Sequence, residues 1–101
     1  MTLDELFITI ATDLENVVSS PVAGSSGREW WRGSLPFATL TGGRAEFRLP
    51  GLVGRAALGT PDTHPSDRGA DWIAFLPSEL DGMALDRAAA WFENAWRHAG
   101  D

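Results

Sequence analysis

The stretch from Pro36 to Leu49, PFATLTGGRAEFRL, decides the fold of this chain. Its two extended runs flank Gly42-Gly43, and paired glycines readily adopt the positive φ angles of a tight hairpin turn. In the second run apolar and charged residues alternate, Ala45, Phe47 and Leu49 against Arg44, Glu46 and Arg48. Successive side chains of a strand point to opposite faces, so one face is apolar and the other charged. The pattern predicts an antiparallel sheet with one buried and one solvated face.

Further strand and helix signals lie on both sides of this hairpin. Arg28 to Arg32 (REWWR) and Asp71 to Leu76 (DWIAFL) are expected to be strands. The second of these is apolar on both faces, which is typical of a central strand. Leu52 to Leu58 follows a Pro-Gly break and predicts a short helix, and Gly59 to Ala70 is a polar loop.

Amphipathic helices are expected at both ends of the chain. Thr2 and Glu5 have the spacing of a capping box, and apolar residues then recur at three- and four-residue steps as far as Val18. We expect this helix to end near Ser19, because Pro21 disfavours helix in the residue before it. The last helix follows Pro77 to Gly82, and its expected buried stripe is Leu85, Ala88, Ala89, Phe92, Ala95, Trp96 and Ala99.

The order of elements predicts an α+β fold. Strands that cluster rather than alternate with helices favour two layers, with helices packed on one face of a mainly antiparallel sheet. The 101 residues are expected to form a single domain spanning 1-101.

Composition excludes several chemistries. The chain has no cysteine, lysine or tyrosine, which removes thiolate nucleophiles, lysine Schiff bases and Walker-type phosphate loops. A net charge of −6 argues against a strong, sequence-independent grip on nucleic acid. The chain opens with Asp4 and Glu5 instead of a basic, apolar signal and has no membrane-spanning run, so we expect a cytoplasmic protein that does not bind membranes.

The adjacent tryptophans of REWWR must face opposite sides of the sheet. With Trp30 outward, it lies between Arg28 and Arg32, and the hairpin adds Arg44 and Arg48. An aromatic side chain among arginines suits base stacking with phosphate contacts, and it equally suits an anionic ligand or a protein partner. The alternative is a solvated face on which arginine stems cover the tryptophan and Glu46 pairs with them.

The Gly59 to Ala70 loop carries the second candidate site. It holds Asp62, His64 and Asp67, together with Ser66, which suggests a small-ligand or catalytic site. Catalytic triads are assembled from separated parts of a chain, however, and residues so close together more often form their own turn. Asp62, Asp67 and Asp71 lack the spacing of an EF-hand. We therefore expect no catalytic residue, no metal and no cofactor.

A family resemblance is carried by Phe37-Ala38-Thr39-Leu40, by Ala45 to Pro50 (AEFRLP), by Asp71-Trp72-Ile73 and by the closing Ala-, Trp- and Phe-rich helix. On these runs, residues 28 to 99 resemble the MmcQ/YjbR-like superfamily, particularly proteins related to the TfoX N-terminal domain. The resemblance implies an α-β(3)-α-β(2)-α two-layer fold. It implies little chemistry: members are mostly uncharacterised, some are labelled DNA-binding, and TfoX-like proteins are linked to competence regulation.

The chain departs from that family in its charges. It lacks the lysines common at the equivalent of Arg44 to Leu49, and its acidic balance weakens a DNA-binding interpretation. No catalytic residue carries over. The sequence thus predicts a non-enzymatic, regulatory or interaction domain, monomeric or homodimeric, with nucleic acid or a protein as partner. The alternative is an enzyme or small-ligand protein that uses the His64 loop.

Overall fold

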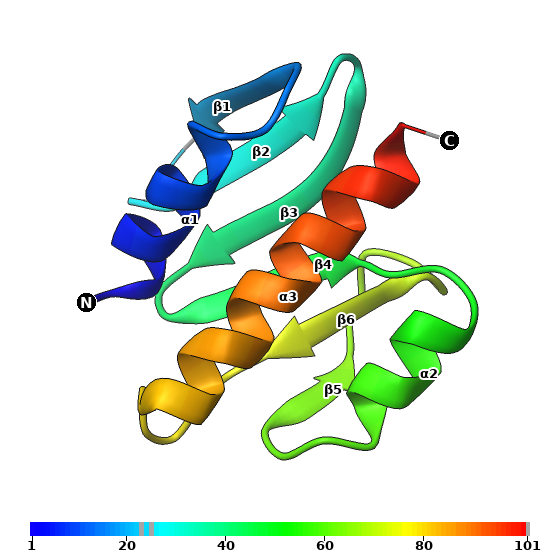
Figure 1. The fold of residues 1–101 in the computed structure, drawn as a ribbon. Helices are drawn as coiled ribbons and strands as arrows, with labels where there is room; N and C mark the ends of the chain where they lie inside the picture. The colour runs from blue at the N-terminus through cyan, green and yellow to red at the C-terminus, as the bar shows by residue number, and fades with distance from the viewer. Residues whose placement is uncertain (23, 25, 101) are drawn as a thin grey trace.

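The computed structural model describes residues 1–22, 24 and 26–100. Three helices cover one face of a six-stranded antiparallel sheet with the order β1-β2-β3-β4-β6-β5 (Figure 1). The elements are α1 (Leu3–Ala11), β1 (Val17–Pro21), β2 (Arg28–Arg32), β3 (Leu35–Thr41), β4 (Arg44–Arg48), α2 (Leu52–Leu58), β5 (Thr63–Pro65), β6 (Trp72–Phe75) and α3 (Gly82–Ala99). The predicted α+β class and order are confirmed. Both edge strands differ from the residue-level prediction: β1 lies where helix was expected, and β5 lies within the predicted loop Gly59 to Ala70.

The central hairpin forms where the sequence predicts it. Gly42 and Gly43 have φ angles of 57° and 80°, and Thr41 pairs with Arg44 across the turn. Ala45 and Phe47 are fully buried against the helices. The sheet therefore has a covered face and an open face, the latter turned away from all three helices, and the charged residues of β4 lie on the open face.

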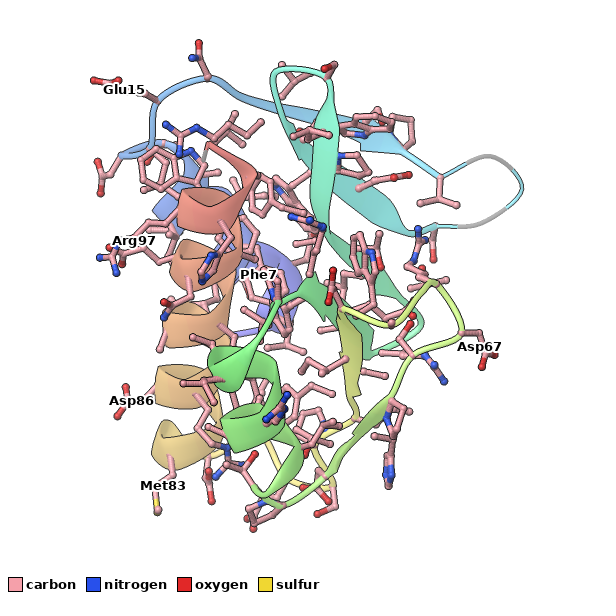
Figure 2. The ribbon with its side chains drawn as sticks, turned by 90° about the vertical axis from the view of Figure 1, so that its right-hand side faces the viewer. Phe7, Glu15, Asp67, Met83, Asp86 and Arg97 are labelled. Atoms are coloured by element: carbon pink, nitrogen blue, oxygen red, sulfur yellow. The ribbon has the colours of Figure 1, made fainter. Side chains whose placement is uncertain are left out.

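Phe92 of α3 is the centre of the core. Its ring stacks on Phe7 of α1 at 4.8 Å between centroids and meets Trp30 and Phe37 edge-on at 5.5 and 5.1 Å. Figure 2 shows Phe7 between the helices and the sheet. A register shift beside Trp30 leaves Phe37 unpaired, so that Phe37 and its neighbour Ala38 are both fully buried.

The first helix is shorter than predicted. It ends at Ala11 and not near Ser19, and Val17–Pro21 forms an edge strand paired with β2. Asn16 turns the chain with a φ of 59°, a conformation that asparagine tolerates better than most residues. The two β-branched valines that follow favour a strand once β2 offers an unpaired edge. Pro21 is accommodated because an edge strand has one side without ladder hydrogen bonds.

The predicted capping box of α1 is confirmed. The Glu5 N–H donates to Thr2 Oγ1 at 3.1 Å, and the Thr2 N–H donates to Glu5 Oε1 at 2.9 Å. The backbone and then the side chain of Thr2 hold the pKa of the Glu5 carboxyl below its usual 4.5. A carboxyl with a lowered folded pKa adds stability above its unfolded pKa, and that contribution is lost as pH falls through the folded value.

Gly54 of α2 is expected to be intolerant of alanine. A Cβ built there overlaps the Leu49 carbonyl oxygen, a backbone atom that cannot move aside as a flexible side chain can. We expect Gly54→Ala to lower the free energy of unfolding by about 1–3 kcal/mol, as overpacking does. This reverses the usual gain of about 0.5–1 kcal/mol for alanine over glycine inside a helix.

The matched control for this prediction is Gly82→Ala, at the first position of α3. A Cβ at Gly82 meets nothing within 4 Å, so this change is expected to be neutral or stabilising. Urea denaturation of the two variants beside the parent protein measures both effects. Equal effects of the two changes, or a larger loss for Gly82→Ala than for Gly54→Ala, would contradict the close approach of Gly54 to Leu49.

Candidate interaction surface on the open sheet face

The outward placement of Trp30 predicted from the sequence is wrong. Trp30 faces the helices and is 1% exposed. Arg28 and Arg32 share that covered face: Arg28 Nε lies 3.2 Å from Asp4 Oδ1, and Arg32 Nη1 donates to the Trp96 carbonyl at 3.0 Å. The Arg32 guanidinium also lies 4.0 Å from the centre of the Trp96 ring. Strand alternation could not decide which tryptophan is buried, whereas the aromatic cluster around Phe92 does.

The sheet thus separates the five residues of the first candidate site. Arg28, Trp30 and Arg32 belong to the covered face, while Arg44 and Arg48 of β4 lie on the open face. That group cannot act together on one ligand.

Two other tryptophans occupy the open face. Trp31, half-buried, lies opposite Val18 on β1 and Pro36 on β3. Trp72 is also half-buried on this side and lies opposite Arg48. Its neighbour Ile73 takes the core position instead, because alternate residues of β6 face the helices.

These residues form a row across the sheet, which we call the tryptophan row: Val18, Trp31, Pro36, Arg48 and Trp72. Val18 is 57% exposed, and both tryptophans keep part of their surface in solvent. The row places large apolar surfaces beside an arginine on the side of the sheet that no helix covers.

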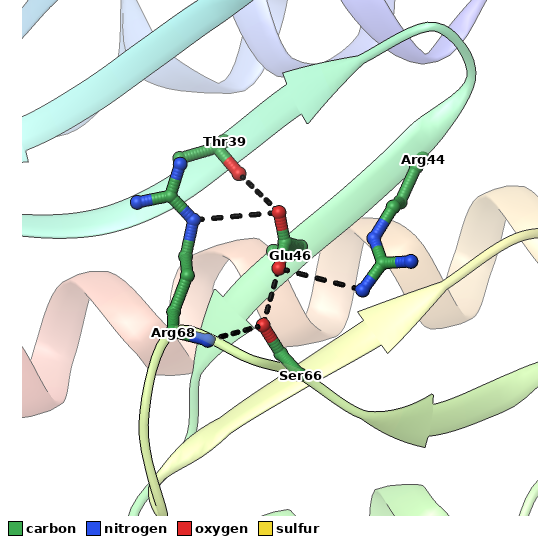
Figure 3. Close-up of polar contacts among 5 residues, drawn as sticks. All are labelled: Thr39, Arg44, Glu46, Ser66 and Arg68. Atoms are coloured by element: carbon green, nitrogen blue, oxygen red, sulfur yellow. Dashed lines mark hydrogen bonds and ion pairs between the residues drawn. The ribbon is translucent and has the colours of Figure 1, made fainter.

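Glu46 is the centre of a polar network beside this row (Figure 3). Glu46 is 9% exposed, and its carboxylate accepts hydrogen bonds from Ser66 Oγ, from Thr39 Oγ1 at 3.4 Å and from Arg68 Nε at 3.3 Å. Arg44 Nη2 lies 3.8 Å from its second oxygen. A carboxylate buried this far is stable only with such partners.

The network joins parts of the chain that are distant in sequence. Arg68 and Ser66 come from the loop after β5, and the Arg68 N–H donates to Ser66 Oγ at 3.1 Å. The Arg68 guanidinium also lies 5.4 Å from the centre of the Trp72 ring. Glu46 therefore holds this loop against the open face. It also forms ion pairs with Arg44 and Arg68, two of the three arginines on that face.

The second candidate site is not assembled. Asp62 Oδ2 accepts from the Ser78 N–H at 3.2 Å with Asp62 at a φ of 66°, so Asp62 stabilises a turn. His64 lies exposed on β5 opposite Ala74, and Asp67 points into solvent away from the sheet (Figure 2). Ser66 donates to Glu46 and not to His64.

No metal centre is formed either within residues 1–22, 24 and 26–100. No three of their histidine and acidic side chains are grouped to hold an ion, and Asp62, Asp67 and Asp71 are not brought together. The turn interpretation of the Gly59 to Ala70 loop fits the contacts of Asp62 and Ser66 better than catalysis does.

Sequence reasoning missed Trp31, Trp72 and Arg68 as surface residues. A signal for Trp72 was present, since Ile73 and Phe75 fill one face of β6 and leave Trp72 and Ala74 for the other. For Arg68 no local signal exists, because Arg68 lies in a loop and its partner Glu46 lies on β4, 22 residues earlier, so that only folding brings them together.

Together, these features define a two-layer α+β domain whose sheet is covered on one side and carries a tryptophan row on the other. No protein-family model, curated protein or solved structure matches the chain. The resemblance to MmcQ/YjbR-like proteins therefore stays a prediction. Among the described residues, no helix is both long and apolar enough to cross a membrane.

Proposed function

We propose that this chain is a non-enzymatic interaction domain that binds a protein partner through the open face of its sheet. The tryptophan row is the observation that carries the proposal. Tryptophan and arginine are the residues most enriched in the energetic centres of protein interfaces, where a half-buried ring adds large contact area at little cost in side-chain freedom.

The charges on the open face favour a protein over nucleic acid. Arg44 and Arg68 are both engaged with Glu46, and Glu29 lies on the same face opposite Thr39. Binding to a phosphate backbone depends on a local surplus of cations, and here most of the positive charge is neutralised within the protein. Single-stranded nucleic acid is the second candidate, because aromatic rings beside Arg48 also suit base stacking.

Family and location belong to the same proposal. The run from Ala45 to Pro50 supports membership of the MmcQ/YjbR-like superfamily, and the acidic start of the chain, with Asp4 and Glu5, supports a cytoplasmic location. Both are consistent with a regulatory binding domain and neither requires a catalytic residue.

Photo-crosslinking from single positions tests the proposal. A photoreactive benzoylphenylalanine replaces Trp31 or Trp72 on the open face, and Leu52 or Met83 on the helices serves as a control. Leu52 and Met83 are 78% and 72% exposed, so a crosslinker at either position is at least as accessible as one at position 31 or 72. After irradiation in cells, we expect protein adducts from positions 31 and 72 alone. Adducts that nuclease removes and protease does not would replace the protein partner with nucleic acid.

A further inference from the structure

We infer that the free edge of β1 is a second binding site, which takes an extended, basic peptide segment of a partner protein as an added strand. The site goes beyond the binding role of the open face. It uses the backbone of the edge strand and a groove on the covered side, and only Val18 belongs to both surfaces. In this mode of recognition, main-chain hydrogen bonds supply affinity and pockets for alternate side chains supply specificity.

The backbone of β1 has hydrogen-bonding groups that turn away from the sheet. Along an antiparallel pair, every second residue bonds to the partner strand, and the residues between present their N–H and C=O on the other side. The Gly33 N–H donates to the Asn16 carbonyl at 3.1 Å, so Val17, Ser19 and Pro21 face outward. The backbone hydrogen bond just beyond the other end of β1 follows the same alternation. Val17 and Ser19 each offer a donor and an acceptor, and nothing in the described part of the chain bonds to them.

The opposite edge of the sheet is protected, whereas the edge at β1 is not. The Ser66 N–H, just past β5, donates to the Trp72 carbonyl at 3.1 Å, so Thr63 and Pro65 are the outward-facing residues there. Proline has no N–H, and β5 is only three residues long. Short strands and proline keep a sheet edge from pairing with another chain. β1 has five residues, and its single proline, Pro21, stands at the end, beyond the two outward donors.

A groove lies beside the outward residues of β1, on the covered side of the sheet. It is lined by Ile8, Ala11, Thr12, Val17, Ser19 and Trp30. Side chains directly opposite each other on neighbouring strands share a face, so residues of an added strand opposite Val17 and Ser19 lie at this groove. There they cover Ile8, which is 41% exposed, and the residue between them covers Val18 on the open face. Apolar, β-branched side chains therefore fit the added strand.

The charge around this edge favours a basic peptide. Residues 1–27, which form α1, β1 and the turn between them, contain no arginine, lysine or histidine. Glu5, Asp13 and Glu15 form no ion pair within the described part of the chain, and the two arginines of β2 are engaged on the covered face. Asp13 and Glu15 lie in the turn that leads into β1. A second copy paired through its own β1 would bring like charges together, whereas arginine or lysine in a peptide meets opposite ones.

Selection from a phage-displayed library of random heptapeptides on the immobilised protein tests the site. We expect the enriched peptides to contain alternating β-branched residues and to carry arginine or lysine. One selected peptide is then synthesised and added at about ten times its dissociation constant, while amide hydrogen exchange is followed by NMR. The amides of Val17 and Ser19 are expected to exchange about tenfold more slowly, since roughly a tenth of the protein stays unbound.

Ser19→Pro tests the backbone contact. The proline replaces an N–H that the sheet does not use, as edge strands tolerate, but the added strand loses a donor and meets the ring. We expect the dissociation constant of the peptide to rise by at least about tenfold. Ser19→Ala is the matched control: it removes the hydroxyl, keeps the N–H and is expected to bind like the parent. Circular dichroism verifies that both variants fold.

The double variant Asp13→Lys, Glu15→Lys tests the charge and leaves the backbone of β1 unchanged. Reversing these two charges is expected to weaken binding of the selected peptide by roughly fivefold. Asp86→Lys is the control, because Asp86 is an exposed residue of α3 that points into solvent (Figure 2). At physiological ionic strength charges far from the peptide are screened, so this change is expected to leave binding as in the parent.

No enrichment above a blank surface, or exchange at Val17 and Ser19 that the peptide does not slow, overturns the edge site. A folded Ser19→Pro protein that binds the peptide as tightly as the parent overturns it as well. Unchanged affinity in the double lysine variant overturns the basic character of the partner. These outcomes are separate from crosslinking at positions 31 and 72, which tests the open face alone.

Discussion

Replacing Phe92 with alanine is expected to lower the free energy of unfolding by about 3–5 kcal/mol, the range measured for aromatic-to-alanine changes in cores. Phe92 is fully buried and contacts the rings of Phe7, Trp30 and Phe37, so its removal opens a cavity between α1, α3 and the sheet. Domains of this size are stable by only about 5–15 kcal/mol, so this single change removes a large part of the total. Urea denaturation followed by circular dichroism measures it.

Leu52→Ala is the control for this prediction. Leu52 is 78% exposed, and its replacement is expected to change stability by less than about 0.5 kcal/mol. A loss below about 1 kcal/mol for Phe92→Ala would contradict a core centred on this ring, because removing an aromatic side chain from a well-packed site destabilises the fold by more than this.

The second large effect is expected at Glu46. Glu46→Ala leaves Ser66 and Thr39 without their acceptor and removes the countercharge of two arginines. We expect a loss of about 1–3 kcal/mol, the cost of leaving buried polar groups unpaired. The arginine side chains, Arg44 and Arg68, are 39% and 35% exposed, so water compensates part of the lost ion pairing.

Glu46→Gln separates hydrogen bonding from charge. Its amide oxygen still accepts from Ser66 but no longer balances the arginines, so its cost is expected to lie below that of Glu46→Ala. Glu93→Ala, which breaks the exposed pair with Arg97 at 2.7 Å, serves as the control and is expected to cost at most about 1 kcal/mol. If urea denaturation at neutral pH gives Glu46→Ala and Glu93→Ala the same loss in free energy of unfolding, the Glu46 network does not stabilise the fold.

The network also prepares the open face for binding. Through Glu46, the loop after β5 is fixed against β3 and β4, and Arg68 is held over Trp72. A surface whose loop is already ordered loses less conformational entropy on association. Glu46 therefore contributes to the proposed interaction by positioning, without itself contacting the partner.

Much of the fold is encoded in local patterns and was predictable. The hairpin around Gly42-Gly43 and the helix Leu52–Leu58 appear as expected, because turn chemistry and strand alternation act over a few residues. The boundary of α1 was not predictable in the same way. Val17 fits a helical stripe and a strand equally well, and only the free edge of β2 decides between them.

The surface was predictable in type but not in detail. The sequence indicates that an arginine-rich sheet face exists, and Arg44 and Arg48 lie on it. Which of the two adjacent tryptophans joins them depends on the contacts of Trp30 with Phe7 and Phe92, which are far apart in sequence. Side-chain alternation predicts that the two tryptophans face opposite sides of the sheet, but tertiary packing decides which of them is buried.

The yield of protein adducts from a photo-crosslinker at position 31, relative to one at position 52, tests the binding role of the open face most directly. The two positions lie on β2 and α2, so the ratio compares the open face with the helical side in the same protein. We predict adducts concentrated at position 31. Equal yields at the two positions, or no protein adduct at position 31, would contradict an interaction domain that uses the open face of its sheet.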